Sequence, residues 1–287
     1  MSLWRGFDVR GARPLLAMVL VAGSLVCLGG GCRGENLGGN PLRTLDLAKF
    51  AVSFDETFET ISISGQRGSG ARWYTHTPWN GDFGNAQFGE NGPGGPFTKL
   101  EHGLRITAHK GANGRWTSGL ISSRDHDGLD PSGFQQQYGY FEIKAKLPSG
   151  DGVWPSFWLI GVDKRKSASE IDVFEYYGRF SDSYRATTHI WQGGRNDGKS
   201  MLILVPKGSL AESFNTYGVL IEADVTTFYL NRKPVGAIPT PPEYRQPFYV
   251  LADLALGGGW PIDKLVGDQT LDIEYIRVYR PLQPRLP

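Results

Sequence analysis

Cysteine is almost absent from this sequence of 287 residues, which contains only Cys27 and Cys32. Both lie in or beside an apolar N-terminal segment, so the rest of the chain cannot form a disulfide of its own. Exported proteins often rely on disulfides for stability. We therefore expect the folded part of this chain to be stabilised by its core without one.

The sequence also lacks an excess of charge of either sign. It contains 30 Lys and Arg and 29 Asp and Glu, which gives a net charge of +1. A nucleic-acid-binding protein presents a basic face, which this balance does not provide. We therefore expect no nucleic-acid partner, and an uncharged partner is favoured instead. The five histidines show no spacing typical of a metal site.

No apolar run is long enough to span a bilayer as a helix, which takes about 20 residues. Residues 15–28 form a shorter apolar run that follows Arg5, Arg10 and Arg13. This order is typical of a secretory signal peptide. We therefore predict a signal peptide over residues 1–31 and an exported protein.

The end of that segment leaves the mode of export open. The residues GGGC at 29–32 resemble a bacterial lipoprotein cleavage site, which would put a lipid anchor on Cys32. A plain cleaved signal or a retained anchor is the alternative. The expected location is periplasmic, extracellular or lipid-anchored at the cell envelope, with any membrane contact made through this segment. Residues 32–48 are polar and glycine-rich, and we interpret them as a linker.

Glycine, proline and aromatic residues are plentiful: 39 Gly, 18 Pro and 12% Phe, Trp and Tyr. The glycine and proline content predicts many turns and few long helices. Short β-branched and aromatic runs separated by turn residues indicate an all-β domain over residues 49–281, with a tail at 282–287. The runs beyond residue 160 are 171–176, 184–191, 217–223, 226–230, 248–256 and 271–279.

Two predicted strands precede residue 161. Residues 140–147 alternate apolar and polar side chains, which indicates one buried face. After the turn sequence PSGDG, residues 153–160 are apolar on both faces and are expected at the centre of a sheet. The alternation puts Trp154, Ser156 and Trp158 on one face, opposite Val153, Phe157 and Leu159.

Candidate catalytic carboxylates lie in the sequence SEIDVFEY at 169–176. Glu170 and Asp172 share one face of a regular strand, whereas Glu175 falls on the other. One extra residue, a β-bulge near residues 173–174, would bring all three to the same side. Crowded carboxylates raise the pKa of at least one member. Such a set can supply the nucleophile and the proton donor of a retaining glycosidase.

The alternative is that these acids form an ordinary solvated strand face. The alternate positions of the segment are apolar, and the segment follows a tryptophan-rich central strand. Both features favour a partly covered cleft over a solvated surface.

The sequence EIDVFE resembles the E-x-D-x-x-E signature of glycoside hydrolase family 16. Residues 54–58, 104–108, 138–159, 247–261 and 273–279 resemble other landmarks of that family in the same order. The resemblance implies a concanavalin A-like β-jelly-roll sandwich of two curved antiparallel sheets. It also implies a secreted, endo-acting retaining hydrolase that cleaves a neutral β-glucan by double displacement.

The same resemblance implies residue roles: Glu170 as nucleophile, Glu175 as general acid/base, and Asp172 as the residue that sets their protonation. The bulged spacing is similar to that of the laminarinase-like branch, so a β-1,3-linked glucan is the first expectation and a mixed 1,3-1,4 glucan the second. A transglycosylase on the same site and a non-catalytic, lectin-like sandwich remain alternatives. We expect a monomer that needs no cofactor.

Aromatic and polar side chains are the candidate sugar-binding residues, because a pyranose stacks its C–H face on a ring. Trp154 and Trp158 lie on the strand before the carboxylates and are expected either to line the cleft or to pack in the core. Trp79, Trp116 and Trp260 lie beside turns. Alternation groups His189 with Thr187 and Trp191. His189 also resembles a histidine that the family has near its catalytic strand, and we therefore expect it to hydrogen-bond the carboxylate row.

Two further expectations come from the family alone. Asn85 and Gln87 resemble its sugar-contacting polar positions, although Ala86 stands where an acidic residue is expected between them. Glu274 occupies the place of a family aspartate near a structural calcium, so calcium there is an open alternative.

Overall fold

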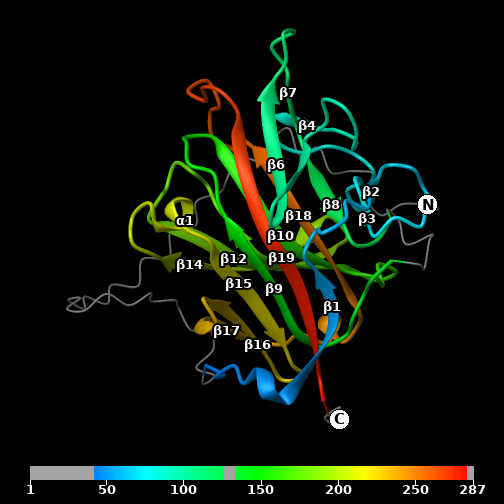
Figure 1. Ribbon diagram of the computed structural model, residues 1–287. Helices are drawn as coiled ribbons and strands as arrows, with labels where there is room; N and C mark the ends of the chain where they lie inside the picture. The colour runs from blue at the N-terminus through cyan, green and yellow to red at the C-terminus, as the bar shows by residue number, and fades with distance from the viewer. Residues whose placement is uncertain (1–41, 126–132, 283–287) are drawn as a thin grey trace.

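The computed structural model describes residues 42–125 and 133–282, which form a sandwich of two β-sheets (Figure 1). The predicted signal peptide, Cys32, the first part of the predicted linker and residues 283–287 of the predicted tail lie outside the described residues. The predicted all-β class is confirmed, and the pairing is antiparallel except for two short parallel pairs, β2 with β3 and β4 with β7.

Sheet B carries the cleft and has the central order β13-β12-β11-β10-β18-β8-β3-β2, with β14 also pairing with β12. Its strands are β2 (Ile63–Ser64), β3 (Trp73–Tyr74), β8 (Leu120–Ser122), β10 (Val153–Gly161), β11 (Ala168–Glu175), β12 (Ser183–Gln192), β13 (Arg195–Asn196), β14 (Lys199–Leu204) and β18 (Phe248–Leu256).

Sheet A packs against sheet B across the main core. Its strand order is β17-β16-β15-β9-β19-β6-β7-β4, and β1 pairs with β19 while β5 pairs with β6. Its strands are β1 (Phe50–Glu56), β4 (Ala86–Phe88), β5 (Phe97–Leu100), β6 (Gly103–Lys110), β7 (Trp116–Ser118), β9 (Gly139–Lys146), β15 (Asn215–Ile221), β16 (Val225–Leu230), β17 (Lys233–Pro239) and β19 (Gln269–Pro281).

Helices are short throughout the described ranges: α1 (Ser209–Glu212) and the 3-10 turns η1 (Leu47–Lys49) and η3 (Pro242–Tyr244). This agrees with the glycine and proline content. No helix in the described part of the chain is both long enough and apolar enough to cross a membrane.

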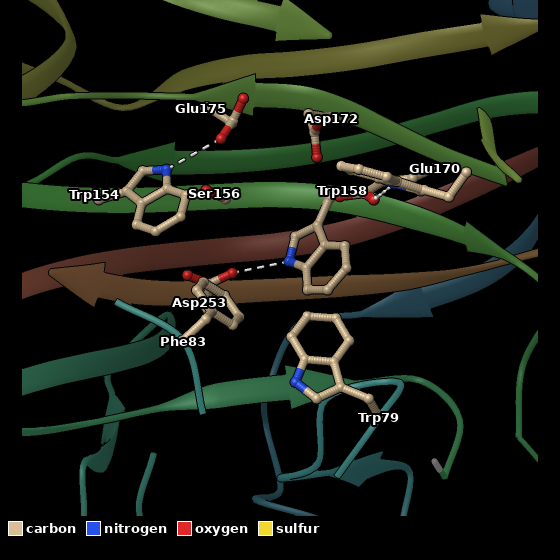
Figure 2. Close-up of a pocket in the computed structure, with 10 residues that line it drawn as sticks. Trp79, Phe83, Trp154, Ser156, Trp158, Glu170, Asp172, Glu175 and Asp253 are labelled. Atoms are coloured by element: carbon tan, nitrogen blue, oxygen red, sulfur yellow. Dashed lines mark hydrogen bonds between the residues drawn. The ribbon is translucent and has the colours of Figure 1, made fainter. Parts of the chain in front are cut away.

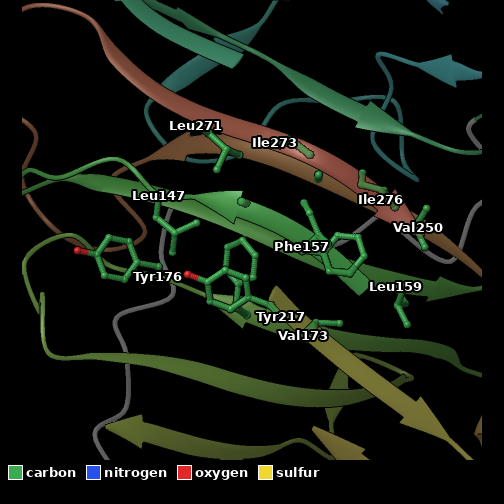
Figure 3. Packing of buried hydrophobic residues seen from close by; sticks show 14 of the residues in the cluster. Leu147, Phe157, Leu159, Val173, Tyr176, Tyr217, Val250, Leu271, Ile273 and Ile276 are labelled. Atoms are coloured by element: carbon green, nitrogen blue, oxygen red, sulfur yellow. The ribbon is translucent and has the colours of Figure 1, made fainter. Parts of the chain in front are cut away.

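The main core lies between the two sheets (Figure 3). Strand β10 lies between β11 and β18 and is apolar on both faces, as predicted. Val153, Phe157 and Leu159 point into the main core, whereas Trp158 and Ile160 pack in a second cluster on the cleft side. The central strand therefore joins the core to the cleft floor.

Strand β9 differs from its prediction, because its second face is also covered at one end. Tyr140 and Glu142 are fully buried there. Tyr140 packs with Leu220 and Tyr229, and the Glu142 carboxylate accepts hydrogen bonds from the Tyr140 hydroxyl and Arg232. A charged side chain can be buried at this point because partners satisfy its oxygens.

The cover on that face includes the last residues of the predicted linker. Leu45 and Leu47 pack against the Tyr140 cluster. The Tyr229 hydroxyl donates to the Arg43 carbonyl at 2.8 Å, and the Arg43 guanidinium contacts Asp224 at 2.7 Å. Residues 43–50, here termed the N-terminal strap, thus lie on the outer face of sheet A, whereas a free linker was expected up to residue 48.

Candidate active site

The three carboxylates are brought together by the bulge that the sequence predicts. On one side of β11, Phe157 pairs with Phe174 and Trp158 pairs with Asp172, which leaves Val173 as the extra residue. On the other side the register also shifts between Asp172 and Glu175. Both bulge residues point into the main core. The following side chain, Glu175, returns to the face of Glu170 and Asp172.

That face forms the floor of a cleft whose wall is largely aromatic (Figure 2). Trp79 and Phe83, from the segment between β3 and β4, lie across the cleft from the carboxylates. Phe83 contacts Trp154 and Trp158 with ring centroids 5.4 and 6.1 Å apart. The cleft is lined by Trp79, Phe83, Trp154, Ser156, Trp158, Glu170, Asp172, Glu175, Trp191 and Asp253.

Glu175 lies in a cage of donors. The Trp154 indole N–H and the Tyr177 hydroxyl both donate to its Oε1 at 3.2 Å, and the Thr187 hydroxyl donates to Oε2 at 3.5 Å. Burial raises the pKa of Glu175 and the charge of Glu170 adds to the rise, whereas His189 and the two donors to Oε1 oppose it. A carboxyl group with a raised pKa can act as a proton donor.

Glu170 lies at the other end of the row and has a simpler environment. The Trp191 indole N–H donates to Glu170 Oε2 at 2.8 Å, and the Tyr244 hydroxyl donates to the Glu170 carbonyl at 2.8 Å. One contact orients the carboxylate and the other fixes the backbone. A held, half-buried carboxylate at this position suits a nucleophile.

Asp172 lies between the two glutamates and contacts His189, whose Nε2 is 3.2 Å from Asp172 Oδ2. Burial raises the pKa of Asp172, as do the charges of both glutamates. Burial alone would lower the pKa of His189, but the hydrogen bond and charge of Asp172 outweigh it and raise the pKa to about 10. The cation expected near neutral pH offsets part of the negative charge of the row.

The same side chains are the one group in the described residues with the geometry of a metal site: Glu170, Asp172 and His189 offer atoms within 4.8 Å of one another. A histidine ligates metal only in its neutral form. The raised pKa of His189 therefore works against a metal here.

Glu274, which the family resemblance associated with a structural calcium, pairs with a lysine in this structure. Glu274 lies at a register shift of β19, and its carboxylate contacts Lys144 Nζ at 2.8 Å. The lysine already supplies the compensating positive charge. A cation as hard as calcium needs six to eight oxygen ligands, so these two residues do not fit a calcium site.

The predicted sugar-binding residues divide into two groups. Trp154, Trp158, Trp191 and Trp79 line the cleft, and His189 contacts the carboxylate row as expected. The second group does not line it: Asn85 and Gln87 are exposed, Trp116 is buried in the main core, and Trp260 packs against Phe180.

Asp253 is a cleft residue that the sequence reasoning missed. Its side chain is fully buried, and its carboxylate accepts from the Trp158 indole N–H at 2.8 Å and the Ala255 N–H at 3.0 Å. Burial raises the pKa of Asp253 to about 8, despite those two donors. A single acid inside the apolar run 248–256 was the available signal.

Similarity to known proteins agrees with this geometry. Residues 96–277 match the family described as glycosyl hydrolases family 16. The chain is 29% identical to the endo-1,3-1,4-beta-glycanase ExsH of Rhizobium meliloti, over 82% of this chain and 53% of that protein. It is also 29% identical to glucan endo-1,3-beta-glucosidase A1 of Niallia circulans, over 58% of this chain and 26% of that protein.

Solved structures are similar in fold. The laminarinase catalytic domain of Thermotoga maritima superposes with a TM-score of 0.63 at 22% identity, covering 82% of this chain and 100% of that chain. The chain spans about half the length of ExsH and of EglC, a second glycanase from the same organism. The match over 96–277 covers more than half of the chain, and the chain therefore belongs to glycosyl hydrolases family 16.

Proposed function

We propose that this protein is an endo-acting hydrolase of β-glucan, with β-1,3 linkages as the first substrate and mixed β-1,3-1,4 linkages as the second. The observation that carries the proposal is the row of Glu170, Asp172 and Glu175 on the floor of an aromatic cleft. Relatives named as endo-1,3-1,4-beta-glycanase and glucan endo-1,3-beta-glucosidase support the choice of linkage.

The proposed reaction is a double displacement with retention. The Glu170 carboxylate attacks the anomeric carbon while Glu175 donates its proton to the departing glycosidic oxygen. The glycosyl ester on Glu170 is then hydrolysed: Glu175 takes a proton from water, and the water oxygen attacks the anomeric carbon to release Glu170. Retention requires carboxyl groups about 5–5.5 Å apart. Glu170 and Glu175 lie on one strand face with Asp172 between them, and both line the same cleft.

The electrostatics suit the change of role at Glu175. In the free protein the charge of Glu170 contributes to the raised pKa of Glu175. That charge disappears when Glu170 becomes an ester, so the pKa of Glu175 falls. The same carboxyl group is thereby converted from an acid in the first step to a base in the second.

A binding protein without turnover is the competing function, and a beta-1,3-glucan-binding protein of Penaeus monodon is 32% identical over 69 residues. The cleft here keeps both glutamates, each held by indole N–H donors, which favours the enzyme. We also propose that the predicted signal at residues 1–31 exports it, since its polymeric substrate lies outside the cell.

The test is product analysis on laminarin, lichenan, agarose and xyloglucan side by side, with the Glu170→Gln variant as control. We expect a ladder of short oligosaccharides from laminarin and lichenan, and none from the variant. Binding of laminarin without any product from the unaltered protein would overturn the proposal in favour of the lectin-like function. Products from the variant at the normal rate would overturn the role of Glu170.

A further inference from the structure

The cleft face of sheet B continues past the carboxylates onto two more strands. Glu175 on β11 lies directly opposite Arg185 on β12, and Arg185 lies opposite Leu202 on β14. Directly opposed residues of antiparallel strands share a face, with Cβ atoms about 4.5–5.5 Å apart. Arg185 and the 40% exposed Leu202 therefore extend the cleft floor on the side of Glu175.

Arg185 is exposed, and its guanidinium has a single polar contact, from Nη1 to the Ser200 hydroxyl at 3.3 Å. Within the described ranges no carboxylate lies within ion-pair distance of it. Seven other arginines do contact a carboxylate: Arg43, Arg72, Arg105, Arg165, Arg179, Arg232 and Arg277. Most of the fork of donors on Arg185 thus remains available to a ligand.

The charge of Arg185 also acts on Tyr177, a neighbour of the proposed acid. Burial raises the pKa of Tyr177, and the charge of Glu175 adds to the rise, whereas Arg185 partly offsets it. The Tyr177 hydroxyl is one of the donors to Glu175. The guanidinium is therefore close enough to act on groups that surround the proposed acid.

We infer that Arg185 forms a subsite for an anionic substituent, a carboxylate or a sulfate ester carried by a sugar bound beside Glu175. The inference rests on the proposed function, in which Glu175 gives its proton to the departing sugar. A guanidinium pairs with carboxylate or sulfate oxygens through two parallel hydrogen bonds. Leu202 beside it supplies apolar surface for the sugar ring.

Arg185 has a second conceivable role, which is to position the Glu175 carboxyl group, and the experiment must distinguish it from an anion subsite. Its contact with Ser200 continues to the Thr187 hydroxyl at 3.1 Å, and Thr187 contacts Glu175 at 3.5 Å. Through this chain Arg185 could position the Glu175 carboxyl group. A positioning role would affect neutral and acidic substrates alike, whereas a subsite affects the acidic ones selectively.

The experiment compares neutral β-1,3-glucan oligosaccharides with the same oligosaccharides after carboxymethylation or sulfation. The measured quantity is kcat/KM for each, in the unaltered protein and in Arg185→Gln, Arg185→Lys and Arg280→Gln. Arg280 is exposed on sheet A, so its variant matches the change of charge at a remote place. Binding to the Glu170→Gln protein by calorimetry, without and with Arg185→Gln, gives a readout independent of turnover.

We expect Arg185→Gln to lower the acidic-to-neutral ratio of kcat/KM by about tenfold, the scale of one charge-assisted hydrogen bond. Arg185→Lys should retain part of the acidic-to-neutral ratio, and Arg280→Gln should retain all of it. Added salt should reduce the ratio of the unaltered protein. A preference restricted to carboxylate or to sulfate would identify which anion is bound.

Two results would overturn the inference while leaving the proposed function in place: equal losses on both substrates in Arg185→Gln, or no preference for acidic oligosaccharides in the unaltered protein. Failure of neutral oligosaccharides both to bind and to be cleaved would instead overturn the proposed function, and the subsite with it.

Discussion

Glu170 and Glu175 are the same residue type on the same strand, and only their surroundings distinguish the roles proposed for them. Glu175 accepts hydrogen bonds from two partly buried aromatic donors, and its pKa is raised by burial. Glu170 accepts one indole N–H at the other end of the row. Assigning the acid and the nucleophile from such differences of environment is a general feature of paired carboxylates.

Replacing Glu175 by Ala should therefore affect substrates according to their leaving groups. We expect turnover of laminarin to fall about 10³-fold, because its sugar leaving group needs a proton. An aryl glycoside with an acidic phenol should lose about tenfold or less, because it departs without one. Steady-state rates of both substrates provide the comparison, with the exposed Glu101→Ala as control. Equal losses on the two substrates would refute the acid role.

His189 provides a prediction of stability against pH. Its folded pKa of about 10 lies above the unfolded value near 6.5. The protonated form is therefore favoured by folding, and this stabilisation is fully present below pH 6.5 and lost as pH rises through 10. We expect the Tm of His189→Gln to lie a few degrees below normal at pH 6, and the gap to narrow by pH 10.

The control is His102→Gln, since the His102 side chain is 77% exposed. Calorimetric scans of both variants between pH 6 and pH 10 give the comparison. A constant gap for His189→Gln across that range would mean that its ion pair with Asp172 does not hold the proton.

Strand alternation and the acid spacing predicted the carboxylate row, because both are local properties, and the family resemblance supported the contact expected of His189. Asp253 and Tyr177 could not be assigned in this way. Asp253 acquires its raised pKa from burial beside a neighbouring strand, and Tyr177 reaches Glu175 from outside the strand. The Asp253 contact joins two strands that are distant in sequence, which a linear pattern does not contain, and the Tyr177 contact depends on how the chain turns where β11 ends at Glu175.

Among the elements, the turn after β18 packs against the two aromatic side chains that donate to Glu175, the proposed acid. A Cβ added at Gly258 would lie 2.6 Å from the Tyr177 ring and 2.7 Å from the Trp154 ring. These two rings stack on each other with centroids 5.9 Å apart, and both donate to Glu175. The turn therefore needs glycine because of a close approach as well as its positive φ of 58°.

Gly258→Ala should accordingly displace the stacked pair and lower kcat on laminarin by tenfold or more, the scale of a small misplacement of reacting groups. Gly267→Ala is the matched control, because Gly267 has a φ of 67° and no atom within 4 Å of the added Cβ. Its kcat should stay within about twofold. Similar kcat values for the two variants would show that the turn does not position the acid.

The bulge in β11 could be predicted, because one extra residue is needed to bring Glu175 to the same face as Asp172. The burial of β9 on both of its faces could not be predicted. The polar side chains of β9 alternate as on an exposed face. Glu142 is nonetheless buried because Arg232 and Tyr140, distant in sequence, satisfy its oxygens. Likewise Glu274 looks like a ligand in sequence but pairs with Lys144 on the neighbouring strand.

On the scale of the whole molecule, the strap and the cleft lie on different sheets. Leu45 and Leu47 cover the Tyr140 cluster on sheet A, and the carboxylates lie on sheet B. The two faces should therefore respond separately to substitution. The fold class followed from composition and turn spacing, but this docking of residues 43–48 depends on a partner surface that the polar, glycine-rich pattern does not reveal.

Replacing both Leu45 and Leu47 by Ser should lower the Tm by about 4–8 °C, since roughly 2 kcal/mol of apolar burial is lost. The kcat on laminarin at 25 °C should be unchanged. Leu42→Ser is the control, because Leu42 is 41% exposed and outside the cluster. Thermal unfolding and initial rates measure the two effects. An unchanged Tm would contradict the docking of the strap.

The central claim is that Glu170 and Glu175 cleave β-glucan with retention, and the anomeric configuration of the first product tests it most directly. Proton NMR during the first minutes of laminari-oligosaccharide cleavage distinguishes the two anomers before they equilibrate. We predict that the β-anomer appears first and that the α-anomer follows by mutarotation. Initial appearance of the α-anomer would contradict the double displacement and the nucleophilic role of Glu170.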